Sequence, residues 1–147
     1  MYKHLFVPVD GSELSARLMS TSIELALQLN AKITGFVVEP DLPLAVLSPS
    51  ADRFTSEIQK HEAENKKHSE VLLEQFRVRA EEAGVEFVGR SVTAYSVSQS
   101  IVESAELEGC DMIVMITHGR GPIGEFIFGS QSQKIVAKSK LPVLVLH

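Results

Sequence analysis

Short apolar runs alternate with helix-like segments along the whole chain, and this alternation most constrains the fold. The apolar runs are His4–Val9, Lys32–Val38, Val85–Val92, Met112–Ile116 and Pro142–Leu146. The segments with helical periodicity are about Ser12–Asn30, Asp52–Ala83, Ser96–Gly109 and Ser130–Ser139. Strands that alternate with helices predict a parallel sheet covered by helices on both faces. The fold class is therefore α/β, with element order β-α-β-α-β-α-β-α-β.

Residues that favour helix ends mark several of these boundaries. Ser12 is the predicted N-cap of the first helix, and Asn30 suits its C-terminal cap. Two Ser–Gln pairs have the spacing of a capping box: Ser96 with Gln99, and Ser130 with Gln133. Ser130 is therefore expected to open the last helix.

Length and charge exclude several classes of partner. The chain has 147 residues, which predicts a single domain over residues 1–147. The net charge is -5, and no basic stripe offers a face for phosphate backbones. Neither nucleic acid nor an anionic membrane surface is expected as the main partner.

Cysteine content and hydropathy predict a cytoplasmic protein. Cys110 is the single cysteine, so no intrachain disulfide can form, which fits a reducing compartment. The apolar part of the N-terminus is too short for a signal peptide, and no apolar run is long enough to span a membrane. Cys110 is predicted to be a small buried residue and not a reactive thiol.

A glycine-rich segment, Thr117–Gln133, follows the fourth predicted strand. Gly119 and Gly124 have the spacing of a P-loop, but Glu125 and Phe126 stand where Lys and Ser or Thr are needed. The run from Gly119 to Gly124 also matches the dinucleotide-binding motif G-x-G-x-x-G. That motif belongs after the first strand and needs an acidic residue about 20 residues further on. Here it follows the fourth predicted strand, and no Asp or Glu occurs after Glu125. Both interpretations are excluded.

The spacing of the glycines supports a third interpretation. Gly119 lies just after a strand, and Gly129–Ser130 lies at the predicted start of a helix. Helix N-termini have unpaired N–H groups and a partial positive charge, so they attract phosphate. Arg120 adds charge and Ser132 adds a second hydroxyl. The segment therefore predicts a phosphate site built mostly from main chain.

Three stretches of the chain resemble the universal stress protein family: VPVDGS, MITHGR and FGSQSQKIVAKSKLPVLVL. The resemblance covers the whole chain. ATP-binding members carry the motif G-x2-G-x9-G-[ST], and Gly119, Gly129 and Ser130 match its latter part. Ile116 stands where the first glycine belongs. If its side chain faces the site it crowds the nucleotide, whereas a side chain that points into the core is tolerable. The sequence leaves both outcomes open.

The resemblance implies a Rossmann-like, open five-stranded parallel sheet with strand order 3-2-1-4-5. Ligands of such sheets bind at the carboxyl ends of the strands, beside the point where the strand order reverses. The family pattern implies ATP, with or without Mg²⁺ near Asp10. Core packing explains Val9 and Val38 equally well, and a turn explains Asp10–Gly11. The candidate nucleotide-binding residues are Pro8, Val9, Asp10, Val38, Gly119, Arg120, Gly129, Ser130, Gln131 and Ser132.

The last strand, Pro142–Leu146, is apolar and almost uncharged, which suits pairing with another chain at a sheet edge. In the family the last strands of two subunits pair, so the resemblance implies a homodimer. The expected function is an ATP-binding stress or regulatory protein with little turnover and an unknown protein partner. The alternatives are a nucleotide-free dimer that acts by protein contact, and a slow ATP hydrolase.

No catalytic or metal-ligating set is identified among the histidines. Their spacings match no metal-ligand motif. His61 and His68 lie on the polar part of the second predicted helix and are expected to be solvated. His118, next to Gly119, is expected to be a loop residue that hydrogen-bonds the main chain.

Overall fold

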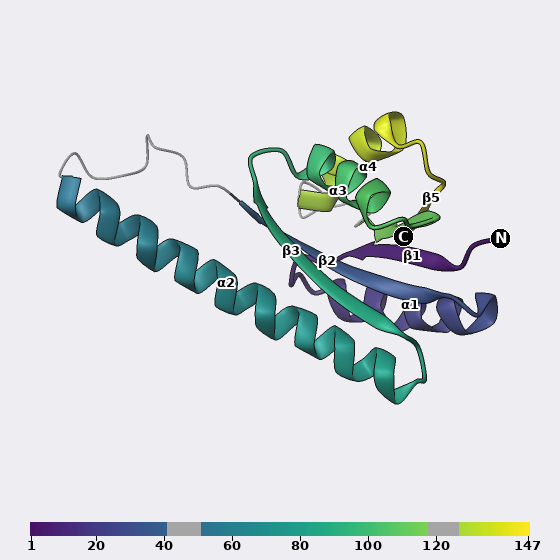
Figure 1. The fold of residues 1–147 in the computed structure, drawn as a ribbon. Helices are drawn as coiled ribbons and strands as arrows, with labels where there is room; N and C mark the ends of the chain where they lie inside the picture. Colours follow the sequence, from purple (N-terminus) through teal and green to yellow (C-terminus); the bar gives the residue numbers. More distant parts are fainter. Residues whose placement is uncertain (41–50, 118–126) are drawn as a thin grey trace.

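A computed structural model describes residues 1–40, 51–117 and 127–147 and shows a five-stranded parallel sheet (Figure 1). The strand order is β3-β2-β1-β4-β5, so both the predicted fold class and the order implied by the resemblance are confirmed. The strands are β1 (His4–Pro8), β2 (Lys32–Pro40), β3 (Phe87–Ala94), β4 (Met112–Ile116) and β5 (Val143–Leu146).

Two helices cover each face of the sheet. Figure 1 shows α1 and α2 on one face and α3 and α4 on the other. The helices are α1 (Ser15–Leu29), α2 (Ala51–Glu82), α3 (Val97–Leu107) and α4 (Ile127–Lys138). Within the described residues, no helix combines the length and the apolarity needed to cross a bilayer.

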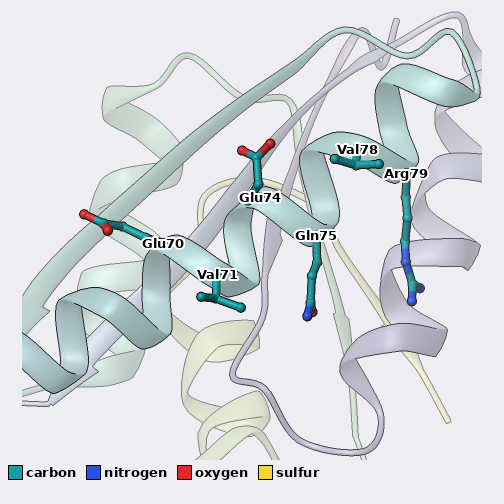
Figure 2. Close-up of a pocket in the computed structure, with 6 residues that line it drawn as sticks. All are labelled: Glu70, Val71, Glu74, Gln75, Val78 and Arg79. Atoms are coloured by element: carbon teal, nitrogen blue, oxygen red, sulfur yellow. The ribbon is translucent and has the colours of Figure 1, made fainter.

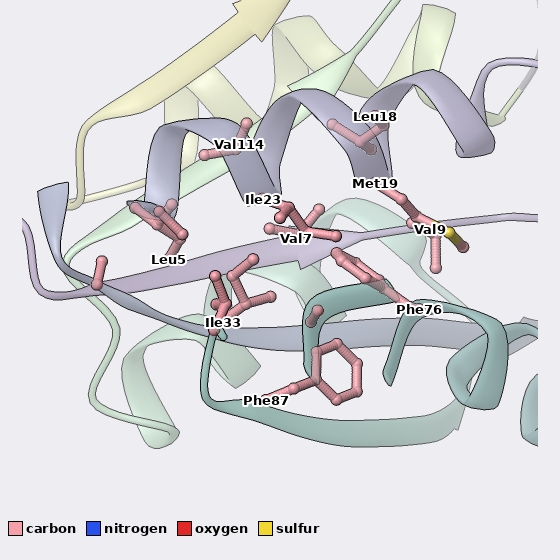
Figure 3. Close-up of a cluster of buried hydrophobic side chains, with 14 of the residues drawn as sticks. Leu5, Val7, Val9, Leu18, Met19, Ile23, Ile33, Phe76, Phe87 and Val114 are labelled. Atoms are coloured by element: carbon pink, nitrogen blue, oxygen red, sulfur yellow. The ribbon is translucent and has the colours of Figure 1, made fainter. Parts of the chain in front are cut away.

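Alternating side chains of each central strand enter two separate cores. Leu5 and Val7 of β1 join a cluster with α1 and α2, shown in Figure 3, whereas Phe6 joins a cluster with α3 and α4. In β4, Val114 and Ile116 belong to the first cluster. This two-residue period explains why the central strands read as continuous apolar runs: both of their faces are buried.

The predicted helix caps are partly right. Asn30 ends α1 in the left-handed conformation, with φ 53°, as expected. Ser96 accepts a hydrogen bond from the N–H of Gln99 at 3.4 Å. The Gln99 side chain bonds Glu103 instead of closing the capping box.

Two predicted N-caps are wrong. The helix α1 begins at Ser15, with Leu14 as its N-cap and no capping side chain. Ser12 instead donates its N–H to the side chain of Asp10, a local turn that competes with helix formation. The helix α4 begins at Ile127, so Ser130 lies inside its first turn and does not open it.

The third strand is displaced from its predicted position by two residues at each end. It was expected at Val85–Val92 and lies at Phe87–Ala94. The N–H of Val85 donates to the carbonyl oxygen of Ala80, so Val85 belongs to the turn that ends α2. Val85 is buried in the core at 4% exposure, which explains why an apolar residue stands there although it is not part of a strand.

Candidate functional site

The candidate site lies at the carboxyl edge of the sheet, where the strand order reverses. The strand β1 pairs with β2 on one side and with β4 on the other. All of these pairs are parallel, so Asp10 and Thr117 follow strands that end at the same edge. The chain leaves β1 toward α1 on one face and leaves β4 toward α4 on the other. Ligands of open α/β sheets bind in the crevice that this arrangement creates.

Asp10 organises the turn that follows β1. Its Oδ1 accepts hydrogen bonds from the N–H of Ser12 at 2.9 Å and from the Ser15 hydroxyl at 3.2 Å. The Ser15 Oγ in turn accepts the N–H groups of Asp10 at 3.3 Å and Gly11 at 3.0 Å. Within the described parts of the chain, Oδ2 of Asp10 accepts no hydrogen bond. One carboxylate oxygen therefore holds the turn, and the other is available to a ligand.

Gly11 adopts a conformation that suits only glycine at this position. Its φ is +79°, in the left-handed region. A Cβ built on Gly11 would lie 2.8 Å from Nε2 and 2.9 Å from Cε1 of His68, which is on α2. The imidazole therefore packs against the open side of the glycine. His68 is exposed, as the sequence predicted. Its contact with Gly11 was not predicted, because no spacing relates residues 11 and 68.

The side chain of Ile116 lies in the core. It is 2% exposed and belongs to the cluster that includes Val7 and Val9. It is the last residue of β4 and pairs with Leu146 of β5, so its backbone is that of an ordinary strand. Among the described non-glycine residues, only Asn30 has a positive φ. Of the two outcomes that the sequence left open, the structure shows the one in which the side chain avoids the crevice.

The other candidate residues on β1 and β2 have structural roles that their burial explains. Pro8 is buried at the end of β1, and Val9 is 1% exposed. The N–H of Val9 donates to the carbonyl oxygen of Phe36 at 2.8 Å, which continues the pairing of β1 with β2. Val38 is half-buried and packs against the second core cluster. Any ligand contact of these residues stays a prediction.

The remaining candidates lie on α4 or outside the described residues. Gly129 is the third residue of α4 and Ser130 the fourth. Gln131 is half-buried and Ser132 is 9% exposed. The first turn of a helix has N–H groups without intrahelical partners, and Gly129 falls within it. Gly119, Arg120 and His118 lie outside the described residues.

A hollow of about 510 Å³ connects the end of β4 with α4 and β5. It brings Thr117 and Ser132 together, although fourteen residues, 118–131, lie between them in the sequence. The N–H of Thr117 donates to the carbonyl oxygen of Leu146 at 2.9 Å. The described residues that line the hollow are Thr117, Ser132, Gln133, Val136, Ala137, Val145 and His147.

A larger hollow, about 690 Å³, lies on the outer face of α2 (Figure 2). All of its described lining residues come from this one helix, and Figure 2 shows Glu74 and Gln75 pointing to different sides. A binding site usually gathers polar groups from several elements around a ligand. This surface lacks that convergence among the described residues, so the carboxyl edge is the better candidate.

The buried titratable groups lie at the opposite, amino edge of the sheet. His4 is 8% exposed, and its Nε2 lies 2.6 Å from the Thr34 hydroxyl. Burial, with the nearby charge of Lys32, lowers the pKa of the His4 imidazole. Burial raises the pKa of the Cys110 thiol to about 12, so this thiol is unreactive at neutral pH. Within the described residues, no three His, Cys, Asp or Glu side chains gather as metal ligands.

The chain matches the family model described as the universal stress protein family over residues 1–147. It belongs to the universal stress protein family. The universal stress protein MJ0577 of Methanocaldococcus jannaschii is 28% identical, over 99% of this chain and 95% of the relative. The solved structure of MJ0577 superimposes with a TM-score of 0.76 at 25% identity and covers 99% of this chain and 96% of that chain.

Two further solved structures share the fold and contain nucleotides. A universal stress protein in complex with cAMP has a TM-score of 0.70 at 24% identity, over 99% of this chain and 97% of that one. A family member from Arabidopsis thaliana with AMP bound has a TM-score of 0.63 at 18% identity, over 98% of this chain and 90% of that one. At these identities the likeness establishes the fold.

Proposed function

We propose that this universal stress protein binds an adenine nucleotide at the carboxyl edge of its sheet. The observation that carries the proposal is the burial of Ile116. Its side chain occupies the core at 2% exposure, so the residue that replaces the first motif glycine leaves the crevice open. The nucleotides bound by two structural neighbours, cAMP and AMP, support adenine as the base.

The described residues at this edge fit a nucleotide. Oδ2 of Asp10 can accept a ribose hydroxyl or lie near Mg²⁺, while Oδ1 keeps the turn in place. The N-terminal turn of α4 supplies main-chain N–H groups, which favour phosphate. The proposed ligand is ATP, with or without Mg²⁺. Carboxylate and phosphate oxygens are the ligands that Mg²⁺ prefers.

We further propose that turnover is low or absent. Hydrolysis needs a positioned water and groups that stabilise the charge of the transition state. Asp10 already uses one oxygen to hold its own turn. Among the described residues at this edge, no histidine and carboxylate are paired as a base and its orienting group. The arrangement therefore suits binding and release better than catalysis.

The edge strand β5 supports a homodimer. The strand pairs with β4 on one side, and it is an outer strand of the sheet. Leu144 is 37% exposed, and Val136 of the adjacent α4 is 53% exposed. We propose that Pro142–Leu146 of two copies pair. Light scattering should show a dimer that Leu144→Lys converts to monomer, whereas Leu107→Lys on the exposed face of α3 should leave it intact. A wild-type monomer would contradict this pairing.

A direct test of the function uses freshly purified protein. The protein is denatured, its small molecules are identified by liquid chromatography and mass spectrometry, and its thermal melt is recorded with AMP and with Mg-ATP. Co-purified adenine nucleotide, or a higher Tm with ligand, is the expected result. An empty protein whose Tm ignores both ligands would favour a nucleotide-free dimer. Repeated turnover of ATP would favour a hydrolase. The single domain, the cytoplasmic location and the regulatory partner stay predictions.

A further inference from the structure

The contact between His68 and Gly11 joins two elements that are far apart in the sequence. His68 lies on α2, and Gly11 lies in the turn between β1 and α1. The imidazole occupies the space where a side chain on Gly11 would stand, at 2.8 Å from the Cβ position. Leu72 is the next neighbour, at 3.8 Å. The side of Gly11 from which a Cβ would project therefore faces side chains of α2, chiefly the His68 ring.

The position of His68 follows from the helical period of α2. Leu72, Phe76 and Ala80 are buried at intervals of four residues and form the stripe that packs on the sheet. His68 lies one turn before Leu72 toward the helix N-terminus and is exposed, while its neighbour Ser69 is buried at 1% exposure. From this border of the buried stripe, the His68 ring contacts the turn at Gly11.

The turn is held from both sides. On the α1 side, the N–H of Gly11 donates to Ser15 Oγ and the N–H of Ser12 donates to Asp10 Oδ1. These bonds are exposed to competition from water, since Gly11 itself is exposed. The His68 ring lies against Gly11 on the α2 side. Loss of the ring would let glycine sample its many other conformations.

We propose that His68 is a positioning residue of the nucleotide site, which acts by holding the Asp10–Gly11 turn in its left-handed conformation. The inference rests on the proposed adenine-nucleotide function. The ring keeps the Asp10 carboxylate at the switch point of the sheet before the ligand arrives. A preorganised turn lowers the entropic cost of binding. The imidazole acts here through its shape and contact, and its charge state is not part of the mechanism.

The first test measures how often the Asp10–Gly11 turn opens in the ligand-free protein. Hydrogen–deuterium exchange is followed in the peptide that contains Asp10, Gly11 and Ser12. His68→Ala should speed exchange of these amides about tenfold by raising the population of open turns. His68→Phe restores a flat ring over Gly11 and should recover most of the protection. His61→Ala, two helical turns away on the same helix, is the matched control and should change nothing. Equal exchange in His68→Ala and wild type would overturn the inference.

The second test measures affinity for AMP and for Mg-ATP by calorimetry. His68→Ala should weaken the binding of both about tenfold, with the ligand-free Tm close to that of wild type. His68→Phe should bind within about twofold of wild type. Wild-type affinity in His68→Ala would overturn the inference even if exchange is faster. If the wild type binds neither nucleotide, the proposed function fails, whereas the exchange experiment still decides whether His68 holds the turn.

Discussion

At the amino edge of the sheet, side chains connect strands to one another, whereas at the carboxyl edge they organise a turn. Oδ2 of Asp111 accepts the N–H groups of Lys3 at 2.6 Å and His4 at 2.9 Å, which joins β4 to the start of β1. At the other edge, the Asp10 carboxylate bonds within five residues of itself, to Ser12 and Ser15.

Because of this difference, we expect stability and ligand binding to depend on residues at opposite edges of the sheet. Contacts between strands are lost on unfolding, so the amino edge contributes to the stability of the whole sheet. A turn that is closed by its own side chains can present main-chain groups and one carboxylate oxygen to a ligand. Mutations at the amino edge are therefore expected to change stability, and mutations at the carboxyl edge are expected to change affinity. Ile116 is the informative exception, because it lies at the carboxyl edge but belongs to the core.

The largest expected effect comes from Ile116. Ile116→Ala should lower the free energy of unfolding by about 2–5 kcal/mol, because it leaves a cavity in the core. AMP affinity should stay within about twofold of wild type. Ile113→Ala, on the same strand but in the other core, is the control and should lose similar stability. Ile116→Val should cost only about 1 kcal/mol and keeps the binding assay practical. Much tighter binding by Ile116→Ala would show that the isoleucine crowds the site.

The next largest expected effect is a loss of stability at the amino edge. Asp111→Ala should destabilise the protein by about 2 kcal/mol, because two N–H groups lose a charged acceptor. Urea unfolding measures the loss, and calorimetry should show unchanged AMP affinity. A weaker AMP affinity with unchanged stability would contradict the assignment of stability to the amino edge and of binding to the carboxyl edge.

The matching change at the carboxyl edge is Asp10→Asn. The amide oxygen can still accept from Ser12 and Ser15, so the ligand-free Tm should barely change. Loss of the charge should weaken Mg-ATP binding about tenfold, which corresponds to about 1.4 kcal/mol. Calorimetry with Mg-ATP measures the affinity. A large fall in Tm with normal affinity would assign Asp10 to structure alone.

The smallest effect is the pH dependence of the amino edge. Burial lowers the pKa of His4 below its ordinary value of 6.5, so the unfolded chain takes up the proton first. The contribution of neutral His4 is present above pH 6.5 and is lost as the pH falls below that value, by at most about 1.4 kcal/mol per pH unit. Urea unfolding between pH 7 and pH 5 should show a shallower loss for His4→Gln than for wild type. If stability depends on pH equally in both proteins, His4 is not the source of the pH dependence.

The fold could be predicted from the sequence because burial on both faces makes the central strands continuous apolar runs. The strand order came from the family resemblance and was confirmed. The boundaries were less predictable, because Val85 is apolar and buried without belonging to a strand. Ser12 and Ser130 failed as caps, since a side chain that can cap a helix can also bond a turn or lie within the helix.

The candidate site shows the same limit. The turn at Asp10–Gly11 could be predicted, because an acidic residue and a glycine after the first strand mark a turn at the carboxyl edge. The direction of the Ile116 side chain could not, because a strand-end residue can face either the core or the crevice. The contact of His68 with Gly11 could not be predicted either. Its contact depends on how α2 crosses the sheet, which packing determines and local sequence does not.

The most direct test of the central claim is an amide chemical-shift titration of the isotope-labelled protein with AMP. We expect shifts at Asp10–Ser12, Thr117 and Gln131–Ser132, with the amides of His4 and Asp111 unchanged. Shifts confined to the amino edge, or no shifts at saturating AMP, would contradict the claim that the carboxyl edge binds an adenine nucleotide.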